Sequence, residues 1–161
     1  MEKNPLDLVS LRNPIHFLAL GFGSGLIAKA PGTWGSLVGL ILGFLLLQVI
    51  NPIYFAFLTF AFFFIGIYLC QKTADDMQIH DHGAIVWDEI VGIFMVLIVL
   101  PTHSFLWYIV AFITFRFFDI LKPYPIRYFD DKLENGFGIM FDDVLAAIYA
   151  ILTIYALHSF I

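Results

Sequence analysis

Five acidic residues lie at the ends of apolar segments in the second half of the 161-residue chain. They are Asp88, Glu89, Asp119, Asp142 and Asp143. Two pairs open an apolar segment and one residue closes another, so an antiparallel helical bundle would bring all five to one level. Carboxylates this close together in a low-dielectric setting repel each other unless something compensates them. Because Mg²⁺ prefers oxygen ligands and pairs with substrate phosphate, we expect these acids to bind Mg²⁺.

All five acids are predicted metal ligands, and Asp88, Glu89 and Asp142 are also predicted to act in catalysis. The simpler alternative is that each acid only caps or anchors a membrane helix. Capping alone does not require doubled acids at two helix starts, so the set as a whole favours a shared site.

Two cations flank Asp119. Arg116 precedes it by about one helical turn, and Lys122 follows it. Either side chain could hold phosphate oxygens or simply balance the carboxylates. We predict that both bind substrate.

Two glycine-rich segments, 21–25 and 31–36, precede the first long apolar run. Glycine lets backbone N–H groups approach an anion closely, and a helix N-terminus adds a positive dipole end. The hydroxyls of Ser24, Thr33 and Ser36 could add hydrogen-bond donors to a phosphate. The same residue types also permit close packing of membrane helices, so both interpretations stay open.

The loop His80-Asp81-His82-Gly83 contains the remaining candidate. Asp81 is predicted to be catalytic, as a base or a further ligand, whereas histidines in a polar loop more often neither titrate nor bind metal. Cys70, the only cysteine, ends an apolar run and is interpreted as a small buried hydrophobe. Its acidic neighbours would raise the thiol pKa, which disfavours a nucleophile.

Composition indicates an integral membrane protein. Hydrophobic residues make up 61% of the chain and charged residues 13%, and the mean hydropathy is +0.91. Five segments approach the length needed to cross hydrocarbon. They are Trp34–Ile50, Ile53–Cys70, Ile85–Leu100, Phe105–Phe118 and Val144–Phe160. We predict an all-α helical bundle forming one membrane-embedded domain over residues 1–161.

The N-terminal region should lie on the membrane surface. Asn13-Pro14 reads as a helix cap and first helical residue, opening a helix too short to cross, which we expect to be interfacial or re-entrant. Residues 2–12 are expected to form an amphipathic stretch. Ala28-Lys29-Ala30 resembles a signal-peptide cleavage site, but the apolar stretch before it is short and broken by glycines, so we expect the N-terminus to be retained.

Threading the segments in order places all eight Lys and Arg residues on or near one side, which the positive-inside rule makes cytoplasmic. All thirteen acids lie on or close to the same side. The net charge of −5 argues against a nucleic-acid partner, and no protein partner is predicted.

Six sequence blocks, in order along the chain, resemble those of the phosphatidylglycerophosphatase A family. They are GFGSG at 21–25, PGTWGS at 31–36, HDHG at 80–83, IVWDEIVG at 85–92, FRFFDILKPYPI at 115–126 and GIMFDDV at 138–144. The resemblance implies an Mg²⁺-dependent enzyme that converts phosphatidylglycerophosphate to phosphatidylglycerol in the bacterial inner membrane. It implies functional roles for Asp81, Asp88, Glu89, Arg116, Asp119, Lys122, Asp142 and Asp143, with Ser24, Thr33 and Ser36 on phosphate-facing loops.

Other classes of function fit the sequence less well. A small transporter could couple cations to the acidic cluster, but a carrier needs polar groups near mid-membrane, and these segments have almost none. A lipid phosphotransferase resembling the CDP-alcohol enzymes would carry a spaced Asp signature that this chain lacks. A purely structural membrane protein is the third alternative.

Overall fold

The computed structural model describes residues 3–161, and the regular secondary structure of this part of the chain consists of helices, without strands. The helices are α1 (Pro14–Ala19), α2 (Pro31–Val49), α3 (Pro52–Met77), α4 (Trp87–Ile98), α5 (Phe105–Leu121), α6 (Ile126–Lys132) and α7 (Gly136–Ser159). Short 3-10 turns, η1 and η2, lie at Pro5–Leu8 and Ser24–Leu26. The predicted all-α class is confirmed. Of the stretch predicted over 2–12, residue 2 lies outside the described residues, and only the turn η1 is helical.

Three helices are long and apolar enough to cross a membrane, judged by length and composition. They are α2, α3 and α7, with 19, 26 and 24 residues. Each of the five predicted segments corresponds to a helix, but α4 has only 12 residues and α5 has 17. At 1.5 Å per residue α4 is about 18 Å long, well short of a hydrocarbon core of about 30 Å. Five is therefore only an approximate count of the spans.

Asparagine caps set several helix starts. The Asn51 side chain accepts a hydrogen bond from the Ile53 N–H at 2.9 Å, directly before Pro52, and Asn13 caps α1 in the same way. Asn135 caps α7 by accepting from the Gly138 N–H at 2.9 Å. Because of this cap, α7 begins eight residues before the predicted start at Val144.

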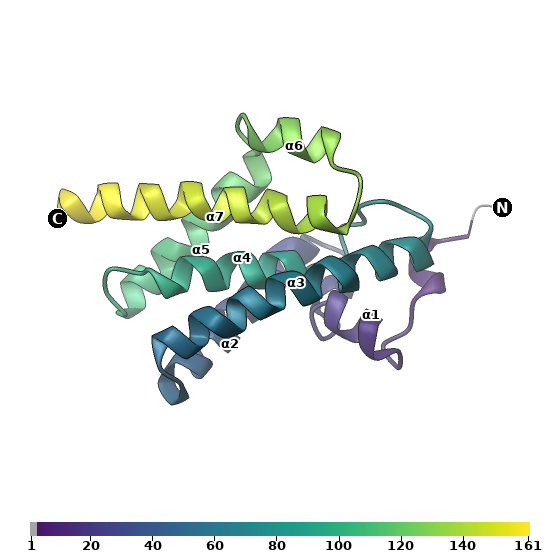
Figure 1. Ribbon diagram of the computed structural model, residues 1–161, viewed down its shortest axis with the longest axis horizontal. Coiled ribbons are helices and arrows are strands. Elements are labelled where there is room, and N and C mark those ends of the chain that lie inside the picture. The colour runs from purple at the N-terminus through teal and green to yellow at the C-terminus, as the bar shows by residue number, and fades with distance from the viewer. Residues whose placement is uncertain (1–2) are drawn as a thin grey trace.

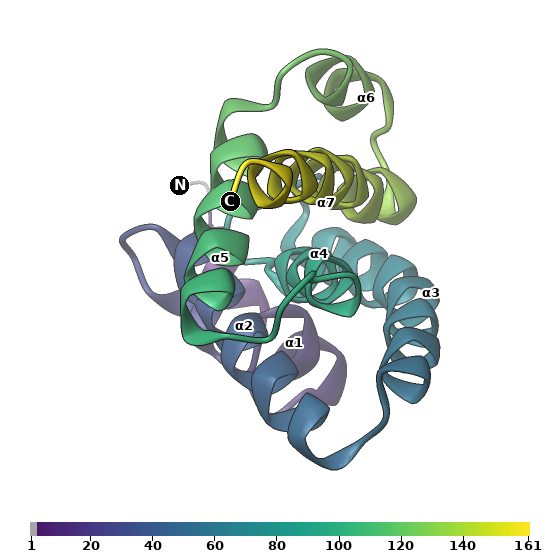
Figure 2. The ribbon, with the colours of Figure 1, turned by 90° about the vertical axis from the view of Figure 1, so that its left-hand side faces the viewer.

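The helices form an up-and-down bundle around α4. In Figure 1 the α2–α3 turn, the α4–α5 turn and the C-terminus lie at one end, and α1 and the α3–α4 connection lie at the other. Figure 2 shows α4 at the centre, with α2, α3, α5 and α7 around it, while α6 packs on the outside of α7. The long helices therefore run in alternating directions, with their connections at alternating ends of the bundle, as the sequence predicts.

Close packing of α2 on α4 depends on glycines at every fourth position of α2, at residues 35, 39 and 43. A Cβ atom on Gly39 would lie 2.6 Å from the Ile93 Cγ2 atom and 2.9 Å from the Ile90 Cα atom. The second of these atoms belongs to the backbone, so a side-chain rotation cannot make room. Small residues at such interfaces let membrane helices approach closely.

We therefore expect Gly39→Ala to push α2 away from α4. The substitution should lower the free energy of unfolding by about 1–3 kcal/mol, the usual cost of overpacking. Thermal unfolding in detergent measures the effect. Gly83→Ala is the matched control, because its Cβ would lie 3.6 Å from the Pro31 Cγ atom, in ordinary contact. Equal melting temperatures for the two variants would contradict the packing argument.

Candidate metal and phosphate site

Three carboxylates converge where α4 meets α7. One oxygen from each of Asp88, Glu89 and Asp143 lies within 4.8 Å of the other two. Asp88 and Glu89 belong to the first turn of α4. Gly92, one turn further along α4, allows the approach of α7, because a Cβ at this position would lie 3.3 Å from the Asp143 Cβ atom.

Each acid of this group, and the adjacent Asp142, has one buried oxygen without a protein partner. Among the described residues, four buried carboxylate oxygens have no hydrogen-bond partner, one each from Asp88, Glu89, Asp142 and Asp143. Asp88 is 7% exposed and Asp143 is 2% exposed, so bulk solvent has little access to these carboxylates. Buried polar groups are normally paired, and oxygen-only donor sets suit hard divalent cations. The residues present therefore fit a bound metal ion.

Asp119 lies beside this group but is engaged with cations. It forms an ion pair with Arg116 across one turn of α5, and its other oxygen is 4.0 Å from the Lys122 Nζ atom. The Asp119 and Arg116 side chains are 8% and 13% exposed. Its carboxyl group is also a close neighbour of that of Asp143.

Lys122 is the second cation of the site. Its Nζ atom lies 3.9 Å from an oxygen of Asp142 and 3.9 Å from an oxygen of Asp130 in α6. Burial lowers the pKa of Lys122, but the surrounding carboxylates outweigh that effect and raise it above its usual value. Lys122 therefore stays charged. Sequence reasoning missed Asp130, which has no distinctive signal among the charged residues of a short surface helix.

Asp142 and Asp143 differ from their predicted setting. They were expected to open the fifth apolar helix, and this expectation is wrong, because α7 starts at Gly136 and both residues lie well inside it. The N-terminal end of the helix dipole therefore contributes little at Asp142 and Asp143, because the effect falls off within the first turn. Lys122 supplies nearby positive charge instead.

The start of α2 contacts the acidic cluster, which consists of Asp88, Glu89, Asp119, Asp142 and Asp143. The contact is made at Gly32. A Cβ atom there would lie 3.0 Å from the Glu89 Oε1 atom and 3.2 Å from each terminal nitrogen of Arg116. A side chain at this position would thus crowd both charged groups. Thr33 follows Gly32 in the first turn of α2.

The two serines of the glycine-rich segments make local hydrogen bonds. The Ser24 hydroxyl donates to the Gly21 carbonyl at 2.7 Å, and the Ser36 hydroxyl donates to the Gly32 carbonyl at 2.8 Å. Ser36 is fully buried. These bonds favour the packing interpretation of the segments, and substrate binding by Ser24 and Ser36 stays a prediction.

Asp81 lies in the loop between α3 and α4 and is exposed to solvent. Partial removal from water raises the pKa of Asp81 above its usual value, although the charge of Lys122 acts in the opposite direction. Of the two neighbouring histidines, His82 accepts a hydrogen bond from the Ala84 N–H at 3.0 Å and so shapes the loop.

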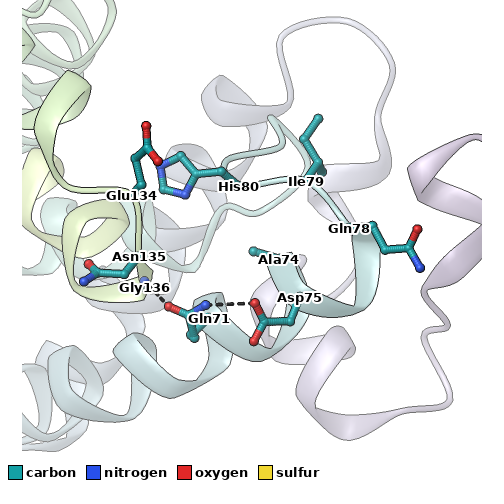
Figure 3. A pocket seen from close by; sticks show the side chains of 9 residues that line it. All are labelled: Gln71, Ala74, Asp75, Gln78, Ile79, His80, Glu134, Asn135 and Gly136. Atoms are coloured by element: carbon teal, nitrogen blue, oxygen red, sulfur yellow. Dashed lines mark hydrogen bonds between the residues drawn. The ribbon is translucent and has the colours of Figure 1, made fainter.

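A separate polar pocket of about 340 Å³ lies between the end of α3, this loop and the start of α7 (Figure 3). Its lining includes His80 but none of the acids of the cluster. Gln71 accepts a hydrogen bond from the Gly136 N–H at 2.7 Å and donates one to Asp75 at 2.9 Å. These contacts join the start of α7 to α3.

Comparison with known proteins assigns the family. The family model described as "Phosphatidylglycerophosphatase A" matches residues 17–158. The chain belongs to the phosphatidylglycerophosphatase A family. This span includes every residue of the acidic cluster and both of its cations, and no solved structure matches the chain.

The relatives are bacterial proteins. The chain is 63% identical over 157 residues to the phosphatidylglycerophosphatase A of Haemophilus influenzae, covering 98% of this chain and 96% of the relative. It is 44% identical over 140 residues to the Escherichia coli protein of that name, covering 87% and 81%. A Bacteroides thetaiotaomicron protein, provisionally named a phosphatidylinositol-3-phosphatase, is 36% identical over 146 residues, covering 85% and 89%.

Because the carboxylates lie so close together, we expect one substitution to stabilise the metal-free protein and to abolish its stabilisation by metal. Asp143→Asn keeps the side-chain shape and removes one negative charge, so the metal-free protein should gain about 1 kcal/mol of stability from reduced repulsion. Added Mg²⁺ should raise the melting temperature of the wild-type protein but not that of the variant.

The exposed Asp131→Asn in α6 is the control and should respond to Mg²⁺ as the wild type does. A metal-free Asp143→Asn protein that melts lower than the wild type and is still stabilised by Mg²⁺ would rule out the three-carboxylate site.

Proposed function

We propose that the chain removes the terminal phosphate of phosphatidylglycerophosphate and releases phosphatidylglycerol, a step of phospholipid synthesis. The observation that carries this proposal is the meeting of three carboxylates, with unpartnered oxygens, beside two cations at one end of a bundle of membrane-length helices. The names of the Haemophilus influenzae and Escherichia coli relatives support the same substrate.

The cation of this site is proposed to be Mg²⁺. Asp88, Glu89 and Asp143 would hold it, and Asp119 and Asp142 lie next to them. A bound Mg²⁺ supplies Lewis-acid polarisation of the phosphoryl group and lowers the pKa of a bound water. The unpartnered oxygens of the cluster support a bound cation, and Mg²⁺ is proposed because it prefers oxygen ligands and pairs with phosphate.

Arg116 and Lys122 are proposed to hold the phosphate oxygens. Both cations face the cluster, and the guanidinium of Arg116 is suited to paired hydrogen bonds with an oxyanion. Because residue 32 is a glycine, the backbone at the start of α2 lies directly against Arg116 and Glu89, so its N–H groups are close to the groups proposed to bind phosphate and metal. Thr33, Ser24 and Ser36 stay predicted substrate contacts.

Asp81 is proposed to accept a proton from the attacking water. A base is most effective when its pKa approaches the working pH, and the raised pKa of Asp81 moves it in that direction. Asp81 is exposed in its loop, so water and a lipid headgroup can reach it.

The site is proposed to face the cytoplasm from the bacterial inner membrane. The positively charged residues gather at the same end of the helices as the acids, which is the inner side by the positive-inside rule. A substrate lipid would then keep its acyl chains in the bilayer while its headgroup reaches the cluster.

The alternative of a cation-coupled transporter has less support. A carrier needs polar groups at mid-membrane depth. Within residues 3–161, the buried carboxylates are Asp88, Asp119, Asp142 and Asp143, all at the cluster. No comparable acid lies deeper in the bundle.

Asp88→Asn should reduce phosphate release from phosphatidylglycerophosphate by about 100-fold or more, because it removes a charged metal ligand. Purified wild-type and variant proteins are compared in mixed micelles, with and without Mg²⁺. Asp7→Asn, an exposed acid in η1, is the matched control and should keep wild-type activity. Full activity of Asp88→Asn at unchanged folding would refute the site.

Phosphatidylinositol 3-phosphate, suggested by the name of the third relative, tests substrate selectivity.

The role of Asp81 predicts a change in pH dependence. A base must lose its proton to act, so activity should rise with pH through the Asp81 pKa, which lies above that of an ordinary aspartate. In Asp81→Asn, the remaining activity at saturating Mg²⁺ should no longer show that acidic limb. If the pH–activity profile of the variant keeps its acidic limb at the same pH, the titrating group is not Asp81.

A further inference from the structure

The short helix α1 takes no part in the proposed chemistry, yet it contains a buried histidine. His16 is 5% exposed, and both of its ring nitrogens have partners. Its Nδ1 atom accepts a hydrogen bond from the Ser10 N–H at 3.1 Å. Nε2 therefore carries the ring hydrogen and donates to the Asp76 Oδ2 atom at 2.7 Å. This bond ties α1 to the last turn of α3.

Asp76 is itself held in place from a second direction. Its other oxygen accepts a hydrogen bond from the Lys72 Nζ atom at 2.5 Å, one turn earlier in α3. With both oxygens engaged, the carboxylate gives His16 a fixed attachment point.

One turn after His16, α1 makes a second connection. The Ala19 carbonyl accepts a hydrogen bond from the Val86 N–H at 2.9 Å. Val86 is the last residue before α4 and is fully buried. A Cβ atom on Gly21 or Gly35 would lie 2.5 Å from a side-chain carbon of Val86, so both glycines make room for it.

These two connections hold the two ends of one loop. Asp76 stands just before the α3–α4 connection and Val86 at its end, with Asp81 between them. His16 and Ala19 are three helical residues apart, a rise of about 4.5 Å, so α1 keeps the loop ends close together. In Figure 1, α1 lies beside this connection at the same end of the bundle.

The loop leads directly into the acidic cluster. Asp88 and Glu89 follow Val86 by two and three residues, and no side chain caps the start of α4. The position of this first turn therefore depends on what holds Val86. Displacements of about 1 Å at such a site can reduce rates about 100-fold.

We propose that His16 is a positioning residue. Through Asp76 it fixes α1, and α1 fixes the Asp81 loop and the first turn of α4, from which Asp88 and Glu89 would bind the metal. The glycine segment 21–25 serves this packing. The inference rests on the proposed metal site.

The test measures the Mg²⁺ concentration that gives half of the Mg²⁺-dependent rise in melting temperature, and separately half-maximal phosphate release. His16→Ala should raise both concentrations about tenfold and lower kcat at saturating Mg²⁺. His16→Gln keeps an N–H donor for Asp76 and should stay within about threefold of the wild type.

His103→Ala is the matched control, since it removes a histidine bonded through Nδ1 to the Tyr108 hydroxyl at 3.1 Å. This pair lies at the opposite end of the bundle, so the Mg²⁺ requirement should be unchanged even if the melting temperature falls. If His16→Ala does not fold, Asp76→Asn carries the test, with a smaller shift in the same direction.

A lower melting temperature with a wild-type Mg²⁺ requirement in His16→Ala, or in Asp76→Asn in its place, overturns the inference. If the wild type binds Mg²⁺ but releases no phosphate from phosphatidylglycerophosphate, the proposed function fails and the melting curves alone decide the role of His16. If Mg²⁺ does not stabilise the wild type, the inference fails with the metal site.

Discussion

Mutual repulsion of buried carboxylates is the constraint on which this bundle depends. Bringing Asp143 up to Asp88 and Glu89 places negative charges a few ångströms apart with little access to water. Two nearby cations cannot neutralise all of the acids, so the fold must hold the charges together by other means. Close packing of the helices holds the charges together. Because negative charge remains uncompensated, the site strongly favours binding a cation.

Small residues make this packing possible. The glycines of α2 let that helix pack closely against α4. Gly92 of α4 likewise makes room for the Phe115 ring of α5 and for Asp143 of α7. Dispersion contacts and backbone proximity hold membrane helices together where burial from water offers no gain. The same close contacts fix the position of α4 in the bundle, so the geometry of the charged site also depends on helix packing further along α4.

Local features of the sequence were enough to predict much of this. Asparagine–proline pairs located the starts of α1 and α3, and uninterrupted apolar runs located the long helices. The gathering of acids at one end followed from threading. Three things lay beyond local reasoning. The start of α7 depends on the cap at Asn135. Asp130 is brought close to Lys122 only by the tertiary fold. The hydrogen bond between His16 and Asp76 links residues 60 positions apart. Glycine segments remained ambiguous because packing and anion binding use the same residues.

The shortness of α4 bears on how the protein is made. A 12-residue apolar stretch that begins with two acids is too short to be recognised as a membrane segment by itself. It must enter the bilayer together with α5, as a hairpin, or after neighbouring helices have inserted and can shelter it. The group of Asp88, Glu89 and Asp143 then assembles last, when α7 is in place. A newly made chain would therefore lack the complete group of three carboxylates until α7 has left the ribosome.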